Sequence, residues 1–391
     1  MKILMIAPEP VFEPRGTPLS VVGRLKAFSD LGFGVDLLTY CMGEDVDFPG
    51  IRIFRIPRIP GIRRVKIGPS FTKIPLDFFL FLKSFRHLLW NKYDLIHTHE
   101  EASFWGVPLS RMFHTPHVYD MHSSLPQQLK NFRFSRSKVL HAVFQRLENW
   151  VLKNADAIIT ICPHLREYVA RLFPEKKPFL IENVVDYGMI FGEAERSDAI
   201  LECYRLDGKS VVLYTGTFEP YQGLDLLVQS AKKVISSVGN TVFVLVGGHP
   251  EQVERYRNKV ASHGLGEHFI FTGQVLPQEV ASYIRCADVL VSPRIRGTNT
   301  PLKIYAYLRS GVPVVATRLP THTQVLDDDV AVLTEPTPEG FAEGILAVLK
   351  NKTYSVKVGE QAKKLAEERY CYSTYKKNLE RVVREAVEAG G

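Results

Sequence analysis

Short apolar runs alternate with amphipathic stretches along almost the whole chain of 391 residues. The runs at 2–7, 35–39 and 95–98 are typical of buried strands, and apolar residues recur at helical spacing between them. The same alternation returns after residue 210, with apolar runs that end near residues 214, 246, 271, 291, 316 and 333. This pattern predicts parallel sheets covered by helices, whose ligands bind at the carboxyl ends of the strands.

Two sets of strands predict two domains, because the length and the 45% hydrophobic content suffice for two cores. We expect the first domain at 1–186 and the second at 210–361. Residues 187–209 are polar and poorly periodic, which is typical of a linker region. Residues 362–391 are amphipathic and predict a C-terminal helix.

The five cysteines are widely scattered and form no Cys-x-x-Cys pair, so neither a disulfide framework nor a zinc site is indicated. No metal and no cofactor are expected. The apolar run at the N-terminus is too short for a signal peptide, and no uncharged stretch is long enough to span a bilayer. We therefore expect a cytoplasmic protein. Nucleic acid is not an expected partner, because no nucleic-acid-binding motif accompanies the basic charge.

One loop has the features of an anion-binding site. Thr300 suits a helix N-cap and Pro301 suits the first helical position after it, as Thr17 and Pro18 do near the N-terminus. A helix that begins there presents free N–H groups and partial positive charge to a phosphate. Lys303 adds a full charge in a first turn where lysine opposes the helix dipole, so an anion beside it is expected; a solvated lysine is the alternative.

Several motifs in order along the chain carry a family resemblance. They lie at 97–99, 155–159 and 183–186 in the first half, and at 214–227, 245–248, 287–293 and 311–317 in the second. Together they resemble the group 1 glycosyltransferases (family 4). The resemblance implies the GT-B fold, an α/β architecture of two Rossmann-like doubly wound domains facing across a cleft. It also implies that the C-terminal helix crosses back to the first domain.

The resemblance further implies a retaining transfer from a nucleotide-sugar donor, bound mainly by the second domain, to an acceptor bound mainly by the first. His122, in its Asp-x-His setting, matches the family's active-site histidine, and with Lys303 it forms the expected catalytic pair. His97 and His99 precede it on a strand, and we expect only one of them to face the ligand. The expected donor-binding residues are Gly16, Gly216, Thr217, Gln222, Gly248, Arg294, Thr298, Asn299 and Thr300.

The chain also departs from the family pattern. Thr298 and Ala306 occupy the places of two glutamates separated by seven residues, and alanine cannot accept hydrogen bonds from a ribose. Thr217 and Gln222 replace the arginine and lysine that usually bind the diphosphate. Replacement charge could come from Lys303 and the neighbouring arginines. A catalytically inert scaffold or partner subunit therefore remains an alternative, as does a sugar-nucleotide epimerase.

Basic charge is concentrated in two stretches of a chain with a formal net charge of +7. Residues 51–76 and 130–146 combine lysines and arginines with apolar side chains. Such segments bind reversibly to anionic membranes. They are consistent with a lipid-linked or cell-surface glycan acceptor and with peripheral contact at the inner membrane face. A solvated basic loop beside buried aliphatic residues is the alternative.

Overall fold

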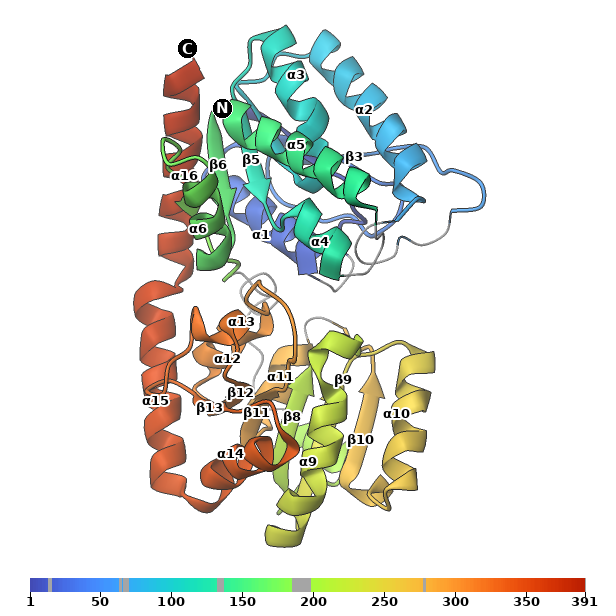
Figure 1. Cartoon of the computed structure of the whole chain (residues 1–391), viewed down its shortest axis with the longest axis vertical. Coiled ribbons are helices and arrows are strands. Elements are labelled where there is room, and N and C mark those ends of the chain that lie inside the picture. The colour runs from blue at the N-terminus through green and yellow to red at the C-terminus, as the bar shows by residue number, and fades with distance from the viewer. Residues whose placement is uncertain are drawn as a thin grey trace. The chain divides into compact units, whose positions relative to one another are not determined.

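The computed structural model describes residues 1–12, 16–62, 65, 70–131, 137–184, 198–276 and 279–390. The chain divides into two compact units (Figure 1). Unit 1 contains Met1–Asn183 and Tyr372–Gly391, and unit 2 contains Val184–Cys371. Each unit is built on its own parallel sheet, so the prediction of two Rossmann-like α/β domains is confirmed.

Unit 1 contains a seven-stranded sheet in the order β3-β2-β1-β4-β5-β6-β7, and its strand pairs are parallel. The strands are β1 (Lys2–Ala7), β2 (Gly34–Thr39), β3 (Ile51–Arg55), β4 (Leu95–His99), β5 (His117–Met121), β6 (Ala157–Thr160) and β7 (Phe179–Leu180). The helices are α1 (Gly16–Asp30), α2 (Lys73–Trp90), α3 (Ser103–Phe113), α4 (Leu125–Asn131), α5 (Lys138–Asn154), α6 (Pro163–Leu172) and α16 (Tyr372–Gly390), with the short 3₁₀ turn η1 (Glu100–Ala102). The strand order reverses between β1 and β4, which is where doubly wound sheets bind ligands.

Unit 2 contains a six-stranded sheet in the order β10-β9-β8-β11-β12-β13. The strands are β8 (Ser210–Thr215), β9 (Thr241–Val246), β10 (Phe269–Gly273), β11 (Val289–Ser292), β12 (Val314–Thr317) and β13 (Val332–Thr334). The helices are α8 (Asp198–Cys203), α9 (Leu224–Ser237), α10 (Pro250–Ser262), α11 (Glu279–Arg285), α12 (Lys303–Ser310), α13 (Pro320–Thr323), α14 (Pro338–Lys350) and α15 (Lys352–Arg369), with the 3₁₀ turns η2 (Pro220–Gln222) and η3 (Gly266–His268). Its corresponding reversal lies between β8 and β11, so the loops after these strands are the expected ligand loops.

The central strands are apolar because helices cover both faces of each sheet. In β1 every residue after Lys2 is buried, and all six residues of β9 are buried. Phe243 and Phe269 stack across β9 and β10 with ring centroids 4.9 Å apart. Because both faces are buried, the sequences of these strands are continuous apolar runs. A sheet with one exposed face would instead show alternating polar and apolar residues.

Both predicted helix starts are wrong by two residues. Helix α1 already includes Gly16, so Thr17 lies inside the helix and is not its cap. Helix α12 begins at Lys303, and Leu302 occupies its N-cap position without a side-chain cap. The amides of Ile304 and Tyr305 donate to the carbonyls of the residues three positions earlier, at 3.0 and 3.3 Å. This tight turn moves the first helical residue beyond Thr300.

The C-terminal segment is two helices and not the single one expected over 362–391. Helix α15 ends at Arg369, and α16 begins at Tyr372 and belongs to unit 1. Of the expected linker region, residues 187–197 lie outside the described residues, and residues 198–203 form α8. None of the helices in the described ranges combines the length and the apolar composition needed to cross a membrane.

Candidate functional site

Two glycine loops approach each other at the carboxyl ends of β8 and β9. Gly216 and Gly247 have φ angles of +136° and +119°, which favour glycine. The Gly216 amide donates to the Val246 carbonyl at 2.9 Å. A Cβ atom on Gly247 would lie 2.1 Å from the Gly216 carbonyl oxygen, so no side chain fits there. The adjoining Gly248 is also restricted, because its φ is +81° and its Cβ would lie 2.6 Å from the ring of Phe218.

Lys303 lies beside the first of these loops. Its Nζ is 3.7 Å from the centroid of the Tyr214 ring, and a Cβ on Gly216 would be 3.0 Å from it. The nitrogen is buried and has no hydrogen-bond partner within the described residues. Burial, with a smaller contribution from Arg294, holds the pKa of Lys303 well below its usual range. The tyrosine ring compensates only part of the cost of burying an ammonium group, and an anion would supply the rest.

Arg294 shapes the loop between β11 and α12. Its Nε donates to the Arg296 carbonyl at 2.8 Å, and its Nη1 donates to the Asn299 carbonyl at 3.0 Å. The guanidinium carbon lies 5.1 Å from the centroid of the Tyr221 ring. Gly297 has a φ of +126°, and a Cβ there would lie 2.5 Å from the Arg294 guanidinium. Two of the arginine's N–H groups are thus committed to the loop itself.

The other predicted donor-binding residues of unit 2 surround this loop or the end of β8. The carbonyl of Thr298 accepts a hydrogen bond from Gln324, and that of Asn299 accepts one from Thr321. Thr217 offers its carbonyl to the Tyr214 hydroxyl at 2.6 Å. The buried Oγ1 of Thr300 and Oε1 of Gln222 have no hydrogen-bond partner among the described residues. Both atoms therefore have hydrogen-bonding capacity that the described residues do not use.

Sequence reasoning missed Tyr307. Its hydroxyl accepts a hydrogen bond from the Thr215 amide at 2.9 Å and lies 3.0 Å from the Thr215 Oγ1. Tyr307 is four residues after Lys303, so both project from the same face of α12. The tyrosine anchors that face to the end of β8 and so positions the lysine beside Gly216. The spacing of four residues was the available signal.

A second group of buried polar side chains lies in unit 1. Arg24 of α1 and Asp120 of β5 are both fully buried, with Nε and Oδ2 2.7 Å apart. Arg24 also donates to the Ile181 carbonyl at 3.2 Å and lies 5.0 Å from the centroid of the Tyr375 ring on α16. Burial would raise the pKa of Asp120, but the charge of Arg24 overrides it and holds the pKa well below the usual range. The carboxylate is ionised at neutral pH.

His122 contacts this ion pair. Its Nε2 lies 3.4 Å from Asp120 Oδ1 and 2.9 Å from the Nδ1 of His99. His97 and His99 lie 3.6 and 3.9 Å from Asp120 Oδ2, so the expectation that only one of them faces the site is wrong. Residues two positions apart on a strand share one face. Burial lowers the pKa of His97 to about 4 and that of His99 well below its usual range, so both are neutral.

His97, His99 and Asp120 could together hold a metal ion, because their ligand atoms lie within 4.8 Å of one another. The chemistry of the donor set argues against this occupant. Asp120 is already paired with a buried guanidinium, whose charge would repel a cation. The cluster is better suited to fixing the position of His122. Gly16, the remaining predicted donor-binding residue, is the first residue of α1 in the same unit.

Glu100 is a second residue that sequence reasoning missed. It follows β4, is buried, and has a φ of +47°, a conformation that is strained for a residue with a side chain. Its Oε2 accepts a hydrogen bond from Ser123 Oγ at 2.9 Å. Burial raises the pKa of Glu100 to about 7, against the opposing influence of His122. Strain of this kind leaves no mark in a single sequence.

This pKa predicts a pH-dependent stability. The folded state binds the Glu100 proton more tightly than the unfolded state, so stability is lost as pH rises from the ordinary glutamate pKa toward 7. A shift of this size corresponds to about 3 kcal/mol. Glu100→Gln is expected to remove that loss, as measured by urea unfolding at about pH 5 and about pH 8. The exposed Glu360→Gln is the control, and an equal pH dependence in all three proteins would contradict the prediction.

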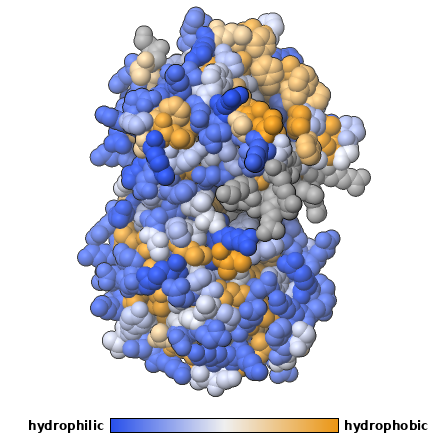
Figure 2. All heavy atoms as spheres, viewed as in Figure 1, coloured by the Kyte–Doolittle hydropathy of each residue, from blue (hydrophilic) through white to orange (hydrophobic). Residues whose placement is uncertain are grey.

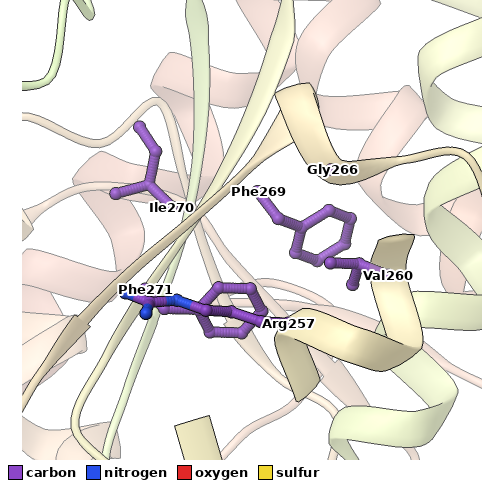
Figure 3. Close-up of a pocket in the computed structure, with 6 residues that line it drawn as sticks. All are labelled: Arg257, Val260, Gly266, Phe269, Ile270 and Phe271. Carbon is purple, nitrogen blue, oxygen red and sulfur yellow. The ribbon is translucent and has the colours of Figure 1, made fainter. Parts of the chain in front are cut away.

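A separate cavity of about 350 Å³ lies in unit 2, between α10, η3 and β10 (Figure 3). It is lined by Arg257, Val260, Gly266, Phe269, Ile270 and Phe271. The cavity adjoins the first residues of β10, whereas ligand loops of parallel sheets follow the last residues of the strands. It therefore lies apart from the group around Lys303.

Two family models of known proteins match the chain, one mostly in each unit. The family model described as Glycosyltransferase Family 4 matches residues 16–188, and the model described as Glycosyl transferases group 1 matches residues 209–351. The chain is 24% identical over 363 residues to phosphatidyl-myo-inositol mannosyltransferase of Mycobacterium tuberculosis, covering 90% of this chain and 88% of the relative.

Two solved structures show the same fold. Sucrose-phosphate synthase from Thermosynechococcus elongatus superposes with a TM-score of 0.76 at 20% identity and covers 98% of both chains. The Anabaena protein HepE in complex with UDP-glucose superposes with a TM-score of 0.76 at 17% identity, covering 98% of this chain and 99% of its own. With two parallel α/β units, and with family models matching a large part of each, the chain belongs to the group 1 (family 4) glycosyltransferases of the GT-B fold.

Proposed function

We propose that this glycosyltransferase moves a sugar from a nucleotide-sugar donor to a lipid-linked or cell-surface glycan, with retention of configuration. The observation that carries the proposal is the buried, unpartnered Nζ of Lys303 beside the Gly216 loop. A diphosphate there would gain the full charge of the lysine. The Anabaena neighbour, of the same fold, was solved with UDP-glucose.

The chemistry proposed for the site is stabilisation of the leaving group. The bond between C1 of the sugar and the diphosphate oxygen breaks, while a bond from C1 to the acceptor oxygen forms on the same face. The acceptor proton passes to the departing diphosphate. Lys303 would stabilise the negative charge that develops on that group, which is the largest single contribution in many enzymes. The Thr300 hydroxyl would donate a hydrogen bond to the sugar nucleotide or accept one from it, and Gln222 Oε1 would accept one.

His122 is proposed to hydrogen-bond the donor sugar or its diphosphate. The ion pair of Asp120 and Arg24, with neutral His99, would hold its ring in one orientation. Gly16, at the first position of α1, is proposed to let backbone approach a phosphate or the acceptor closely. Gly216, Thr217, Gly248, Arg294, Thr298 and Asn299 complete the proposed donor-binding set.

The acceptor is proposed to be carried on a lipid. The mycobacterial relative is named for a phosphatidyl-myo-inositol acceptor. Residues 51–76 and 130–146 would contact the cytoplasmic face of the membrane through their basic and apolar side chains. Residues 63–64, 66–69 and 132–136 of these stretches lie outside the described residues.

A catalytically inert relative is the second candidate, and the residues at the two glutamate places favour it. The Oγ1 of Thr298 is directed to Asn299 Oδ1 at 3.3 Å, and Ala306 has no polar atom beyond its backbone. A donor ribose would lack its usual carboxylate partner at Ala306, and Thr298 offers no carboxylate either. The two candidates differ in whether any donor is turned over.

Incubation with a panel of UDP- and GDP-sugars tests the proposal. Release of the nucleoside diphosphate, and its loss in folded His122→Ala and Lys303→Met variants, is the expected result. Retention is checked by the NMR coupling constant of the new anomeric proton. An isomerised nucleotide sugar without acceptor would instead identify an epimerase. If no donor releases its nucleoside diphosphate, and circular dichroism shows that the protein is folded, the result would favour the inert relative.

A further inference from the structure

Helix α2 is apolar on both of its faces. The inner face packs Leu76, Leu80 and Leu88 into the core of unit 1. The outer face, with its flanking residue Phe71, exposes large apolar side chains at positions where a helix on a protein surface normally carries charges. These exposed side chains are Phe71, Ile74, Phe78, Phe79, Leu82, Leu89 and Trp90. Phe78 is 57% exposed and Trp90 is 79% exposed, so neither is covered by unit 1.

The charge around this outer face has one sign. Residues 51–92 contain ten lysines and arginines and a single acid. Of the basic residues, Arg52, Arg55 and Lys73 pair with acids outside the segment, and residues 63, 64 and 66 lie outside the described residues. The acid, Asp77, accepts a hydrogen bond from the Tyr40 hydroxyl at 2.5 Å and is half-buried. The exposed charge on the outer face is that of Arg86. Any occupant of this surface meets apolar side chains and positive charge.

The apolar surface continues onto the neighbouring helix α3. Met112 is 62% exposed, and the exposed Arg111 precedes it. Figure 2 shows orange and pale-orange atoms gathered over the part of unit 1 formed by α2 and α3. Exposed apolar surfaces of this extent mark interaction sites. At 18 residues, α2 is about 27 Å long, enough to lie along an interface over several lipids.

We propose that the outer face of α2 binds an anionic lipid bilayer, with Phe78, Leu82 and Trp90 inserted among the acyl chains near the headgroups. The exposed Arg86 and Lys92 match anionic headgroups, and tryptophan prefers the boundary between headgroups and hydrocarbon. The helix lies on the membrane and does not cross it, in accord with its composition. The inference rests on the proposed membrane contact. It assigns the main contact to the outer face of α2, whereas the sequence pointed to residues 51–76.

Flotation of the full chain with lipid vesicles tests this surface without any sugar, so its failure is distinguishable from a failure of sugar transfer. Binding is expected to vesicles that contain phosphatidylglycerol and to be much weaker with phosphatidylcholine alone. Phe78→Gln combined with Leu82→Gln is expected to weaken binding about tenfold or more. Arg86→Gln is expected to weaken it roughly fivefold at low salt, and less at high salt.

Matched controls lie on α15 of unit 2. Val356→Gln removes an apolar side chain that is 50% exposed, and Lys364→Gln removes an exposed charge; neither should change vesicle binding. Trp90 provides a local signal, because its emission should shift to shorter wavelength with phosphatidylglycerol vesicles and the shift should vanish in Trp90→Phe. Equal binding by wild type and the α2 double variant would overturn the proposal. A second outcome would also overturn it: wild type forms a dimer and does not bind vesicles, and the double variant is a monomer.

Discussion

Lys303→Met is expected to reduce kcat/KM for sugar transfer by about a hundredfold or more, close to the cost of losing one charge-stabilising donor. The same change is expected to abolish the rise in melting temperature caused by UDP or GDP. Both results follow from the position of Nζ, which is buried beside Gly216 without a hydrogen-bond partner in the described residues. Methionine replaces the apolar stem of the side chain but has no charged group to bind a phosphate.

The unliganded variant provides the test of burial. Since burial holds the pKa of Lys303 below its usual range, the unfolded chain binds this proton more tightly than the folded one. Wild type should therefore gain stability as pH rises from the lowered pKa toward the ordinary lysine value, and Lys303→Met should not gain it. At neutral pH the variant should be as stable as wild type or more so. The exposed Lys364→Met is the control for both measurements.

Two outcomes would contradict this account of Lys303. One is a variant that retains its thermal shift with nucleoside diphosphates, which would place the anion elsewhere. The other is a variant that is much less stable than wild type without ligand, which would make Lys303 a structural residue. Urea unfolding and thermal unfolding separate these outcomes without a known acceptor.

Asp120→Asn is expected to lower the free energy of unfolding by about 3–5 kcal/mol, because it leaves the guanidinium of Arg24 buried without a counter-charge. Asparagine has nearly the same shape, so the loss measures charge and not packing. Urea unfolding followed by circular dichroism is the measurement. The exposed pair of Lys233 and Glu343 is the matched control, and Glu343→Gln is expected to cost less than about 1 kcal/mol.

The pH dependence follows from the same pair. The pKa of Asp120 is held well below its usual range, so its contribution is complete above the ordinary aspartate pKa and is lost as pH falls through the lower folded value. Asp120→Asn should be uniformly less stable above that range, and the difference from wild type should shrink in strong acid. A loss below about 1 kcal/mol at neutral pH would show that solvent reaches Arg24.

Arg24→Met combined with Asp120→Asn distinguishes stability from positioning. Removing both charges should recover much of the stability lost in the single variant, because no buried charge then lacks a partner. His122 would still have lost the carboxylate 3.4 Å from its Nε2. The double variant is therefore expected to fold and yet to transfer sugar poorly.

Much of the fold could be predicted because strand and helix periods are local properties. The buried runs of β1 and β9 identify parallel strands, and their order along the chain identifies two sheets. The place of Lys303 in the first turn of a helix could be predicted as well, because a threonine and a proline that suit a helix start precede it. The exact first residue of α12 could not be predicted. The turn at its start is held by backbone hydrogen bonds from Ile304 and Tyr305, and no residue type in the sequence specifies them.

The amino-acid sequence by itself determined the two parallel α/β units, the family, and a lysine at the mouth of α12, since each depends on residue types at short spacing. Only the tertiary structure decided which groups meet. Arg24 and Asp120 are 96 residues apart, and Tyr307 reaches Thr215 across 92 residues. The strain at Glu100 and the exposed face of α2 likewise depend on what the rest of unit 1 covers. Long-range packing sets these contacts, and it leaves no periodic signal in a single chain.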